Sequence, residues 1–247
     1  MSDRLAAAQA ALNAGRREQA IEHLIAAVSE DPARAVQVYR ALVVQLYNAG
    51  RFAEGESYAA QGLQRFPRDY DLLNTRGVLL RKLRRQAEAI PLFEQAIKLN
   101  PKALAAQQNL GNVLLDLGEA ARAETVYTKL VRTQPRDPEF QRQLGRALAK
   151  LGRIDPALMR LRQAIALKRD SVEAWLDMIG ILNEELRNAE AVETLDKALE
   201  ALPGNQRLME ARVVLLRRSG QTKQAVAYLK SLLPSHPDDA WIHYQLG

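Results

Sequence analysis

The side chains that could carry out nucleophilic, acid–base or metal chemistry are few and scattered in this sequence. There is no Cys, which excludes disulfides, thiolate metal sites and a cysteine nucleophile. The three histidines, His23, His236 and His243, lack the spacing of a metal site. We therefore expect no catalytic residue, no metal and no cofactor in this segment.

Two pairs of adjacent carboxylates occur, Glu184 with Glu185 and Asp238 with Asp239. Neighbours on a helix point to different parts of its surface, whereas acid–base machinery needs groups that converge. We expect both pairs to serve solvation and capping.

Three cations, Arg142, Arg146 and Lys150, are spaced four residues apart and would form one ridge on a helix. Such a ridge could bind the carboxylates or phosphates of an acidic peptide. It could equally be a solvated face neutralised by acidic neighbours such as Glu139. The sequence leaves both interpretations open.

Composition limits the remaining classes of protein. The formal net charge of +6 and the pI of about 9.6 favour acidic partners without naming one. The first residues lack the basic and apolar regions of a secretory signal, and no apolar stretch approaches membrane-spanning length. We expect a cytoplasmic, bacterial protein that does not associate with membranes.

The elements that position these side chains follow from an internal repeat. Proline recurs at intervals of 34, 34, 68 and 34 residues, after a first interval of 35, at Pro32, Pro67, Pro101, Pro135, Pro203 and Pro237. Seven units and the beginning of an eighth result: 1–34, 36–69, 70–103, 104–137, 138–171, 172–205, 206–239 and 240–247.

The same positions of each unit carry the same kind of residue. Position 20 is always small: Ala20, Gly55, Ala89, Ala123, Ala157, Ala191 and Ala225. Position 8 is Gly in Gly77, Gly111, Gly145 and Gly247, and faces a large residue at position 24, such as Phe93, Tyr127 or Leu161. Position 15 is a turn glycine in five units: Gly15, Gly50, Gly118, Gly152 and Gly220. Each unit is predicted to be two closely packed helices joined by a short turn.

This pattern resembles the tetratricopeptide repeat, with small residues at positions 8, 20 and 27, an aromatic residue or Leu at 24 and Pro at 32. The resemblance implies an all-α fold, an α-solenoid that forms a right-handed superhelix of about seven helix–turn–helix units.

The sixth unit departs from the pattern. Ile179 replaces the small residue at position 8, Gly180 follows it, and Leu186 replaces the turn glycine. We expect this hairpin to pack more loosely or to rotate slightly. Asp170, three residues before Glu173, is expected to cap its first helix.

Prolines give further expectations about the helices. Pro138 after Asp137 and Pro156 after Asp155 fit the first turn of a helix behind an N-cap. Pro91 predicts either a mild kink inside a second helix or a place in that helix's first turn.

The eighth unit stops in mid-helix, so we expect Trp241, Ile242 and Tyr244 to be partly exposed. One interpretation is that the chain is the N-terminal portion of a longer protein. The other is a naturally short chain whose last half-helix caps the array or contacts a second copy.

The resemblance also implies where a partner binds, because the first helix of each repeat lines the concave groove with positions 2, 5, 9, 12 and 13. The groove residues that follow for this sequence are Arg40, Tyr47, Asn74, Arg81, Lys82, Gln108, Asn112, Arg142, Arg146, Lys150, Asn183 and Arg217.

Three function classes remain open. The first is a scaffold that binds a protein or peptide, expected to be acidic, in the groove. The second is the substrate-docking part of a larger glycosyltransferase or sulfotransferase, because Asn109-Leu110-Gly111-Asn112 and the Ala-, Arg- and Leu-rich repeats resemble bacterial transferases of this layout. The third is a basic nucleic-acid-binding solenoid, ranked last because few aromatic residues are placed for stacking on bases.

Overall fold

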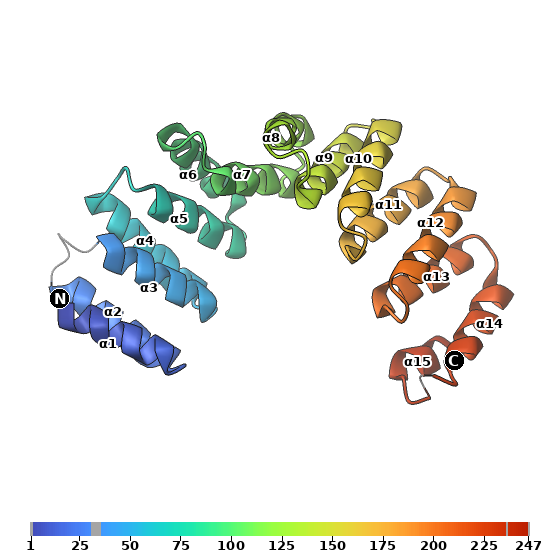
Figure 1. Ribbon diagram of the computed structural model, residues 1–247, viewed down its shortest axis with the longest axis horizontal. Helices are drawn as coiled ribbons and strands as arrows, with labels where there is room; N and C mark the ends of the chain where they lie inside the picture. Colours follow the sequence, from blue (N-terminus) through green and yellow to red (C-terminus); the bar gives the residue numbers. More distant parts are fainter. Residues whose placement is uncertain (1, 31–35, 236, 247) are drawn as a thin grey trace. The chain divides into compact units, whose positions relative to one another are not determined.

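The computed structural model describes residues 2–30, 36–235 and 237–246. Pro32, His236 and Gly247 lie outside the described residues. Within the described ranges all regular structure is helical, in agreement with the predicted all-α fold (Figure 1). The helices are α1 (Ser2–Asn13), α2 (Arg17–Glu30), α3 (Val36–Asn48), α4 (Phe52–Arg65), α5 (Tyr70–Lys82), α6 (Gln86–Leu99), α7 (Leu104–Asp116), α8 (Ala120–Thr133), α9 (Pro138–Lys150), α10 (Ile154–Leu167), α11 (Val172–Glu184), α12 (Asn188–Ala201), α13 (Gln206–Arg218), α14 (Thr222–Leu232) and α15 (Ala240–Leu246).

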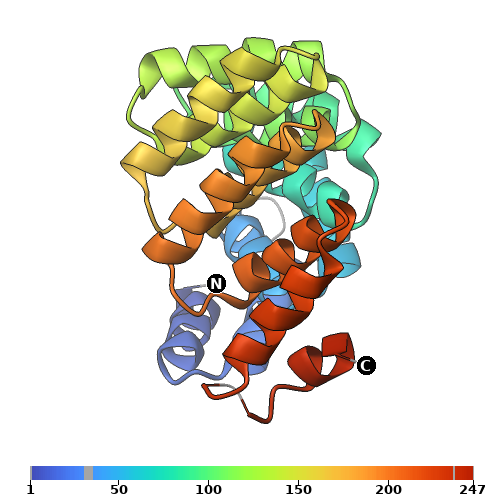
Figure 2. The same ribbon diagram turned by 90° about the vertical axis from the view of Figure 1, so that its right-hand side faces the viewer.

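Contacts divide the chain into two compact units, Met1–Leu130 and Val131–Gly247. We call them the N-terminal unit and the C-terminal unit and describe each by itself. In both, odd-numbered helices pack against the even-numbered helices that follow them, as α5 does against α6 and α9 against α10. Neighbouring odd-numbered helices also touch, α3 with α5 and α5 with α7 in the first unit, and α9 with α11 and α11 with α13 in the second. Figure 2 shows the even-numbered helices α10, α12 and α14 of the C-terminal unit as successive, roughly parallel rods.

The core of each hairpin is built on the predicted pairing of small and large residues. An added Cβ at Gly77 would lie 2.6 Å from the Phe93 ring, and one at Gly111 would lie 2.6 Å from the Tyr127 ring. Phe93 and Tyr127 are completely buried. The absence of a side chain at position 8 therefore lets the two helices of a hairpin approach closely.

The turn inside each hairpin needs a left-handed residue, and the sixth unit keeps this turn without glycine. Leu186 takes φ of 58°, close to the 73° of Gly152. Arg187 N donates to Leu182 O at 2.8 Å, as Arg153 N does to Leu148 O at 3.0 Å. The turn of this unit therefore matches that of Gly152, with the packed helices holding Leu186 in a conformation that costs a non-glycine residue free energy. The looser or slightly rotated packing expected of this hairpin stays a prediction.

Of the helix caps predicted at Asp137 and Asp170, one is confirmed and one is wrong. Asp137 caps α9 with Pro138 in the first turn, as predicted. The N-cap of α11 is Ser171, whose hydroxyl accepts from Ala174 N at 3.3 Å, so Asp170 is not the cap. Asp170 is not the cap because α11 begins at Val172, one residue later than a cap at position 170 requires.

The structure also shows where Asp155 and Pro91 lie within their helices. Asp155 does not cap α10, since that helix begins at Ile154 and Asp155 already lies inside its first turn. Its carboxylate instead accepts from Arg187 at 2.7 Å. Pro91 lies inside α6, five residues after its start and therefore beyond the first turn.

The last helix is better packed than expected. Ile242 is completely buried in a cluster with Val213, Leu216 and Leu229, whereas the sequence suggested partial exposure. Trp241 is half-buried, and Tyr244 is 81% exposed. The correction follows from α14, which supplies an apolar face that covers Ile242.

Candidate functional site

The predicted groove residues lie on the odd-numbered helices, which form one face within each unit. We call this surface the odd-helix face: α3, α5 and α7 in the N-terminal unit, and α9, α11 and α13 in the C-terminal unit. Each of these helices begins at the N-cap of its hairpin and ends 13 residues later, so equivalent positions recur at the same level.

In the N-terminal unit the odd-helix face carries a shallow apolar depression. It has a volume of about 240 Å³ and is lined by Val44, Tyr47, Asn74, Thr75 and Val78. Lys82 Nζ lies 5.9 Å from the centre of the Tyr47 ring, at cation–π distance. The structure thus brings Tyr47, Asn74 and Lys82 together.

The amide-bearing groove residues of this unit are partly engaged within the protein. Asn74 Oδ1 accepts from Asn109 Nδ2 at 2.9 Å, and Asn112 Oδ1 accepts from the Tyr127 hydroxyl at 2.7 Å. The same hydroxyl donates to the main-chain carbonyl of Gln108 at 3.3 Å. Asn112 and Gln108 therefore help to position the buried Tyr127.

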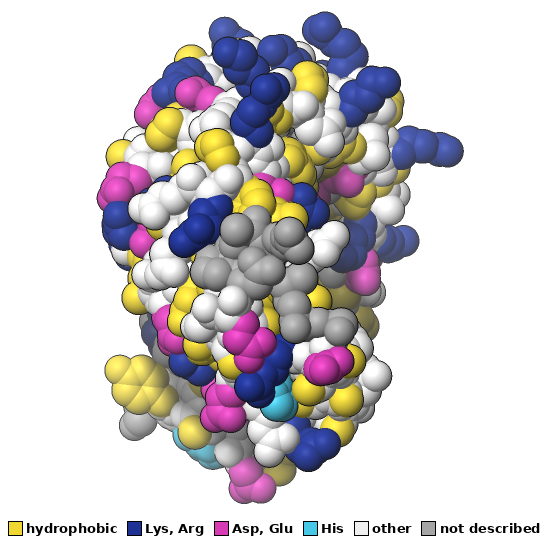
Figure 3. Space-filling view, turned by 90° about the vertical axis from the view of Figure 1, so that its left-hand side faces the viewer, with side chains coloured by type: hydrophobic (Ala, Val, Ile, Leu, Met, Phe, Trp, Pro, Cys, Tyr) yellow, Lys and Arg dark blue, Asp and Glu magenta, His cyan; other side chains and the backbone are white. Residues whose placement is uncertain are grey.

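The predicted cations of the N-terminal unit bridge neighbouring hairpins. Arg40 binds Asp71 at 2.8 Å and also Asp69, the N-cap of α5. Arg81 binds Asp116 of α7 at 2.6 Å. These guanidinium groups are already neutralised by carboxylates of the next hairpin. Figure 3 shows one face of the molecule, on which Lys and Arg side chains and Asp and Glu side chains are both present.

In the C-terminal unit Arg142 is the best-fixed cation. It donates two hydrogen bonds to Glu139, at 2.8 and 2.9 Å, and a third to Asp177 on α11 at 2.7 Å. Its side chain is only 13% exposed. This confirms, for Arg142, that acidic neighbours including Glu139 neutralise the cation.

Burial and charge act against each other on the pKa values of this cluster. Burial opposes the charged form of Arg142, yet Glu139 and Asp177 raise its pKa above the ordinary value. Burial would raise the pKa of Glu139, but the hydrogen bonds from Arg142 and Gln143 outweigh it, so the pKa is lowered. Burial raises the pKa of Asp177, because the charges of Arg142 and Arg146 offset it only in part.

The predicted ridge of three cations is consequently uneven. Arg146 donates to Gln143 Oε1 at 2.9 Å and lies 3.9 Å from Asp177. Lys150 is exposed and forms no ion pair with any residue that the structure describes. Only the last member of the ridge is a free cation.

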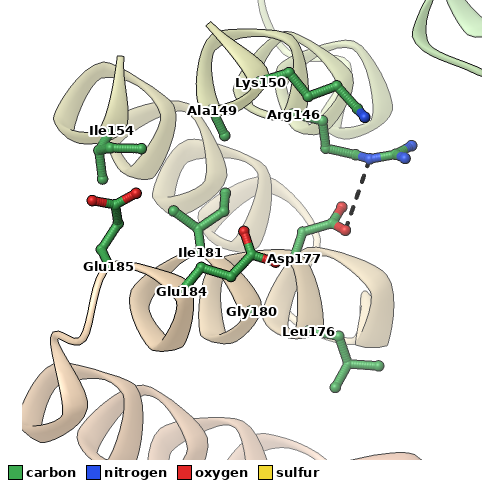
Figure 4. Close-up of a pocket in the computed structure, with 10 residues that line it drawn as sticks. All are labelled: Arg146, Ala149, Lys150, Ile154, Leu176, Asp177, Gly180, Ile181, Glu184 and Glu185. Atoms are coloured by element: carbon green, nitrogen blue, oxygen red, sulfur yellow. Dashed lines mark ion pairs between the residues drawn. The ribbon is translucent and has the colours of Figure 1, made fainter. Parts of the chain in front are cut away.

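Next to this ridge lies a slot of about 310 Å³ between α9 and α11 (Figure 4). Arg146 and Lys150 stand on the α9 side, and three carboxylates, Asp177, Glu184 and Glu185, belong to the α11 side. The slot is also lined by apolar residues and one glycine: Ala149, Ile154, Leu176, Gly180 and Ile181.

Glu184 and Glu185 both line this slot. Glu184 is the last residue of α11, and Glu185 is its C-cap. In Figure 4 the carboxyl group of Glu185 points toward Ile154, while that of Glu184 lies nearer Asp177. The two side chains thus leave the end of α11 in different directions and both border the slot.

A second depression, of about 200 Å³, lies between α11 and α13. Its lining is apolar apart from the predicted Asn183: Leu176, Ile179, Gly180, Asn183, Ala211, Val214 and Leu215. Leu176 and Gly180 belong to both hollows, which therefore adjoin across α11.

Arg217, the remaining predicted residue, lies away from these hollows. It donates to the side chain and the main-chain carbonyl of Gln245 on α15, at 2.6 and 2.7 Å. The structure thus brings Arg146 and Lys150 to the slot and Asn183 to the second depression. Arg142 lines neither hollow but donates a hydrogen bond to Asp177 of the slot.

The sequence analysis missed Gly180 and the two glutamates as site residues. A signal for Gly180 existed, because position 9 of the other units from the second onward is larger: Val44, Val78, Asn112, Arg146 and Val214. For Glu184 and Glu185 no sequence signal was available, since the slot that they line is formed between helices of two different repeats.

Neither a metal site nor a membrane span emerges from the parts of the chain that the structure covers. Residues 2–30, 36–235 and 237–246 contain no group of three or more His, Asp or Glu side chains able to hold a metal ion. Over the same ranges no helix has the length and apolar character that crossing a bilayer requires.

Solved structures show the same fold at low sequence identity. A tetratricopeptide repeat protein from Parabacteroides merdae has a TM-score of 0.78 and 15% identity, over 99% of this chain and 96% of its own. MamA from Desulfovibrio magneticus (TM-score 0.65, 20% identity) is matched over 98% of its chain and 70% of this one. YrrB, described as a tetratricopeptide repeat protein with an unusual peptide-binding site, has a TM-score of 0.62 and 20% identity over 76% of this chain and 97% of its own.

The comparison with curated proteins gave no match. Two family profiles described as tetratricopeptide repeat do match, one over residues 80–151 and 182–246, the other over 41–104 and 142–206. Each covers more than half of the chain. This chain therefore belongs to the tetratricopeptide repeat family and is an α-solenoid of helical hairpins.

Proposed function

We propose that this protein is an interaction scaffold that binds a segment of a partner polypeptide on the odd-helix face of its C-terminal unit. The observation that carries the proposal is the pair of adjoining hollows along α9, α11 and α13. They combine apolar lining with a few charged and amide groups, which is the usual composition of a site for a peptide side chain.

The family adds support from a protein of the same fold. YrrB carries a peptide-binding site by its own description, so the solenoid is compatible with that role. In the present chain Arg146, Lys150 and Asn183 are the predicted residues that line the hollows. Arg142 has a different role in the proposal, because its ion pairs fix α9 to α11 and leave it little capacity for a ligand.

Site-specific photo-crosslinking tests the proposal. A photoreactive amino acid replaces Val214, which is 54% exposed on the odd-helix face, or Met159, which is 47% exposed on α10 of the same unit. Both variants of the full chain are irradiated in a cell lysate, and the adducts are digested and sequenced. We expect polypeptide adducts at position 214 and few at position 159.

The Met159 variant is the matched control, since it presents the same reagent at similar exposure on an even-numbered helix. Equal labelling at both positions would mean non-specific contact and would remove the support for this face. Adducts confined to position 159 would place the partner elsewhere.

A further inference from the structure

Gly180 interrupts the row of side chains along the odd-helix face. A Cβ added there would meet no atom within 4 Å, so neighbouring packing does not demand glycine. Other repeats have a side chain at this level, and Val44 and Val214 are 43% and 54% exposed. The surface of α11 is therefore recessed at Gly180. At the equivalent position of other repeats a side chain projects and forms a ridge.

The gap lies where the two hollows meet. The slot between α9 and α11 and the depression between α11 and α13 share Gly180 and Leu176. Figure 4 shows Leu176 pointing away from Arg146 and Asp177, so it does not close the slot at Gly180. An extended chain can therefore cross α11 over Gly180 and place one side chain in each hollow.

The charges of the slot select the first side chain. Asp177 and Arg146 face each other, whereas Glu184 and Glu185 are exposed and form no ion pair with any described residue. With Lys150, the lining has three carboxylates and two cations. A Lys or Arg side chain fits this slot, because its head can approach the glutamates while its stem lies on Ile154 and Ile181.

The second hollow selects an apolar side chain. Leu176, Ala211 and Val214 offer carbon surface, and Asn183 is the polar side chain in the lining. Its amide can donate to and accept from the backbone of a ligand that crosses α11. An aliphatic residue of the ligand would bury its surface against Val214, which is otherwise half exposed.

The geometry points to a ligand in which a Lys or Arg and an aliphatic residue lie three positions apart, bound across Gly180. This inference rests on the proposed function and names the partner segment that the site takes. Packed helices lie about 8–10 Å apart, and a polyproline-II chain advances about 3.1 Å per residue with about three residues per turn. Residues three apart therefore lie on one side of the ligand at the separation of neighbouring helices.

Selection from a random peptide library displayed on phage tests the inference with the full chain immobilised. We expect the enriched peptides to carry Lys or Arg three residues before or after Leu, Ile or Val. Synthetic peptides of that sequence should bind about tenfold more weakly to Gly180→Val, and also to the double variant Glu184→Gln, Glu185→Gln.

Ala189→Val is the matched control, because it adds the same side chain at an exposed site of α12. It should bind the peptides like the unaltered protein. Gly180→Val is expected to keep the fold, since a Cβ at this position meets no atom within 4 Å, and circular dichroism checks this.

The outcomes separate the inference from the proposed function. Enrichment of acidic peptides, or equal binding by Gly180→Val, overturns the inference, while the crosslinks at position 214 can still support a binding face. If no peptide is enriched and position 214 gives no adduct, both fail.

Discussion

Replacing Gly77 by alanine tests whether close approach between the helices of a hairpin requires glycine. The new Cβ would lie 2.6 Å from two carbons of the Phe93 ring. Carbon atoms pack at about 3.5–4.0 Å, so the ring or the helix has to move by about 1 Å. Phe93 has no exposed surface into which it can move.

Two opposing terms set the size of the effect. Alanine favours a helix interior over glycine by about 1 kcal/mol, and overpacking a core costs about 1–3 kcal/mol. Because the Gly77 clash involves a rigid, buried ring, we expect a net loss of about 1–2 kcal/mol in the free energy of unfolding.

Two further glycines isolate the packing term. At Gly145 the added Cβ would be 3.0 Å from Leu161, a milder contact, and at Gly180 it would meet nothing within 4 Å. Gly180→Ala should therefore show only the helix gain and stabilise by about 1 kcal/mol. Gly145→Ala should lie between the other two variants.

Urea unfolding followed by far-UV circular dichroism measures the three variants against the unaltered protein. The reasoning requires the order of stability Gly180→Ala, Gly145→Ala, Gly77→Ala. It would be refuted if Gly77→Ala were as stable as Gly180→Ala, because the distances to Phe93 would then have no energetic consequence.

Three other predictions follow from the turns and ion pairs. Arg142→Ala should lower the free energy of unfolding by about 2 kcal/mol, since it removes three hydrogen bonds to the half-buried carboxylates of Glu139 and Asp177. Arg146→Ala should change it by less than about 0.5 kcal/mol, and equal urea midpoints of the two variants would contradict this. Leu186→Gly should stabilise by about 0.5–1 kcal/mol, because it removes the cost of φ at 58° and adds freedom to the unfolded chain, and a lower melting temperature would count against it. The pKa of Glu139 is lower in the folded than in the unfolded protein, so its contribution to stability is present above the unfolded pKa and is lost as pH falls through the folded pKa. Glu139→Gln should therefore be less stable than the unaltered protein at neutral pH, and the difference in urea midpoint should shrink in acid. A difference that stays constant with pH would exclude this linkage.

The sequence was sufficient to predict the hairpins because their determinants are local and repeated. Position 20 is small in all seven units, and a turn glycine occurs at position 15 of five of them. Leu186 shows the limit of such patterns, since its backbone is held by the packing of α11 and α12, which no single position records.

The site was less predictable, because it depends on which charges pair across hairpins. The spacing of Arg142, Arg146 and Lys150 predicted a common ridge, and they do share one helix. The pairing of Arg142 and Arg146 with Asp177 depends on contacts between residues about one repeat apart. Such contacts have no signature in the residue spacing of a single helix.

The helix contacts described above also bear on how the chain folds during synthesis. Within each unit, the helices that pack on one another are at most two places apart in the sequence. A ribosome adds about 5–20 residues per second, so a new hairpin emerges every few seconds, while helical proteins with such local contacts fold in microseconds to milliseconds. Each hairpin can therefore dock on its predecessor before the next is complete, and Arg142 can meet Asp177 as soon as α11 leaves the ribosome.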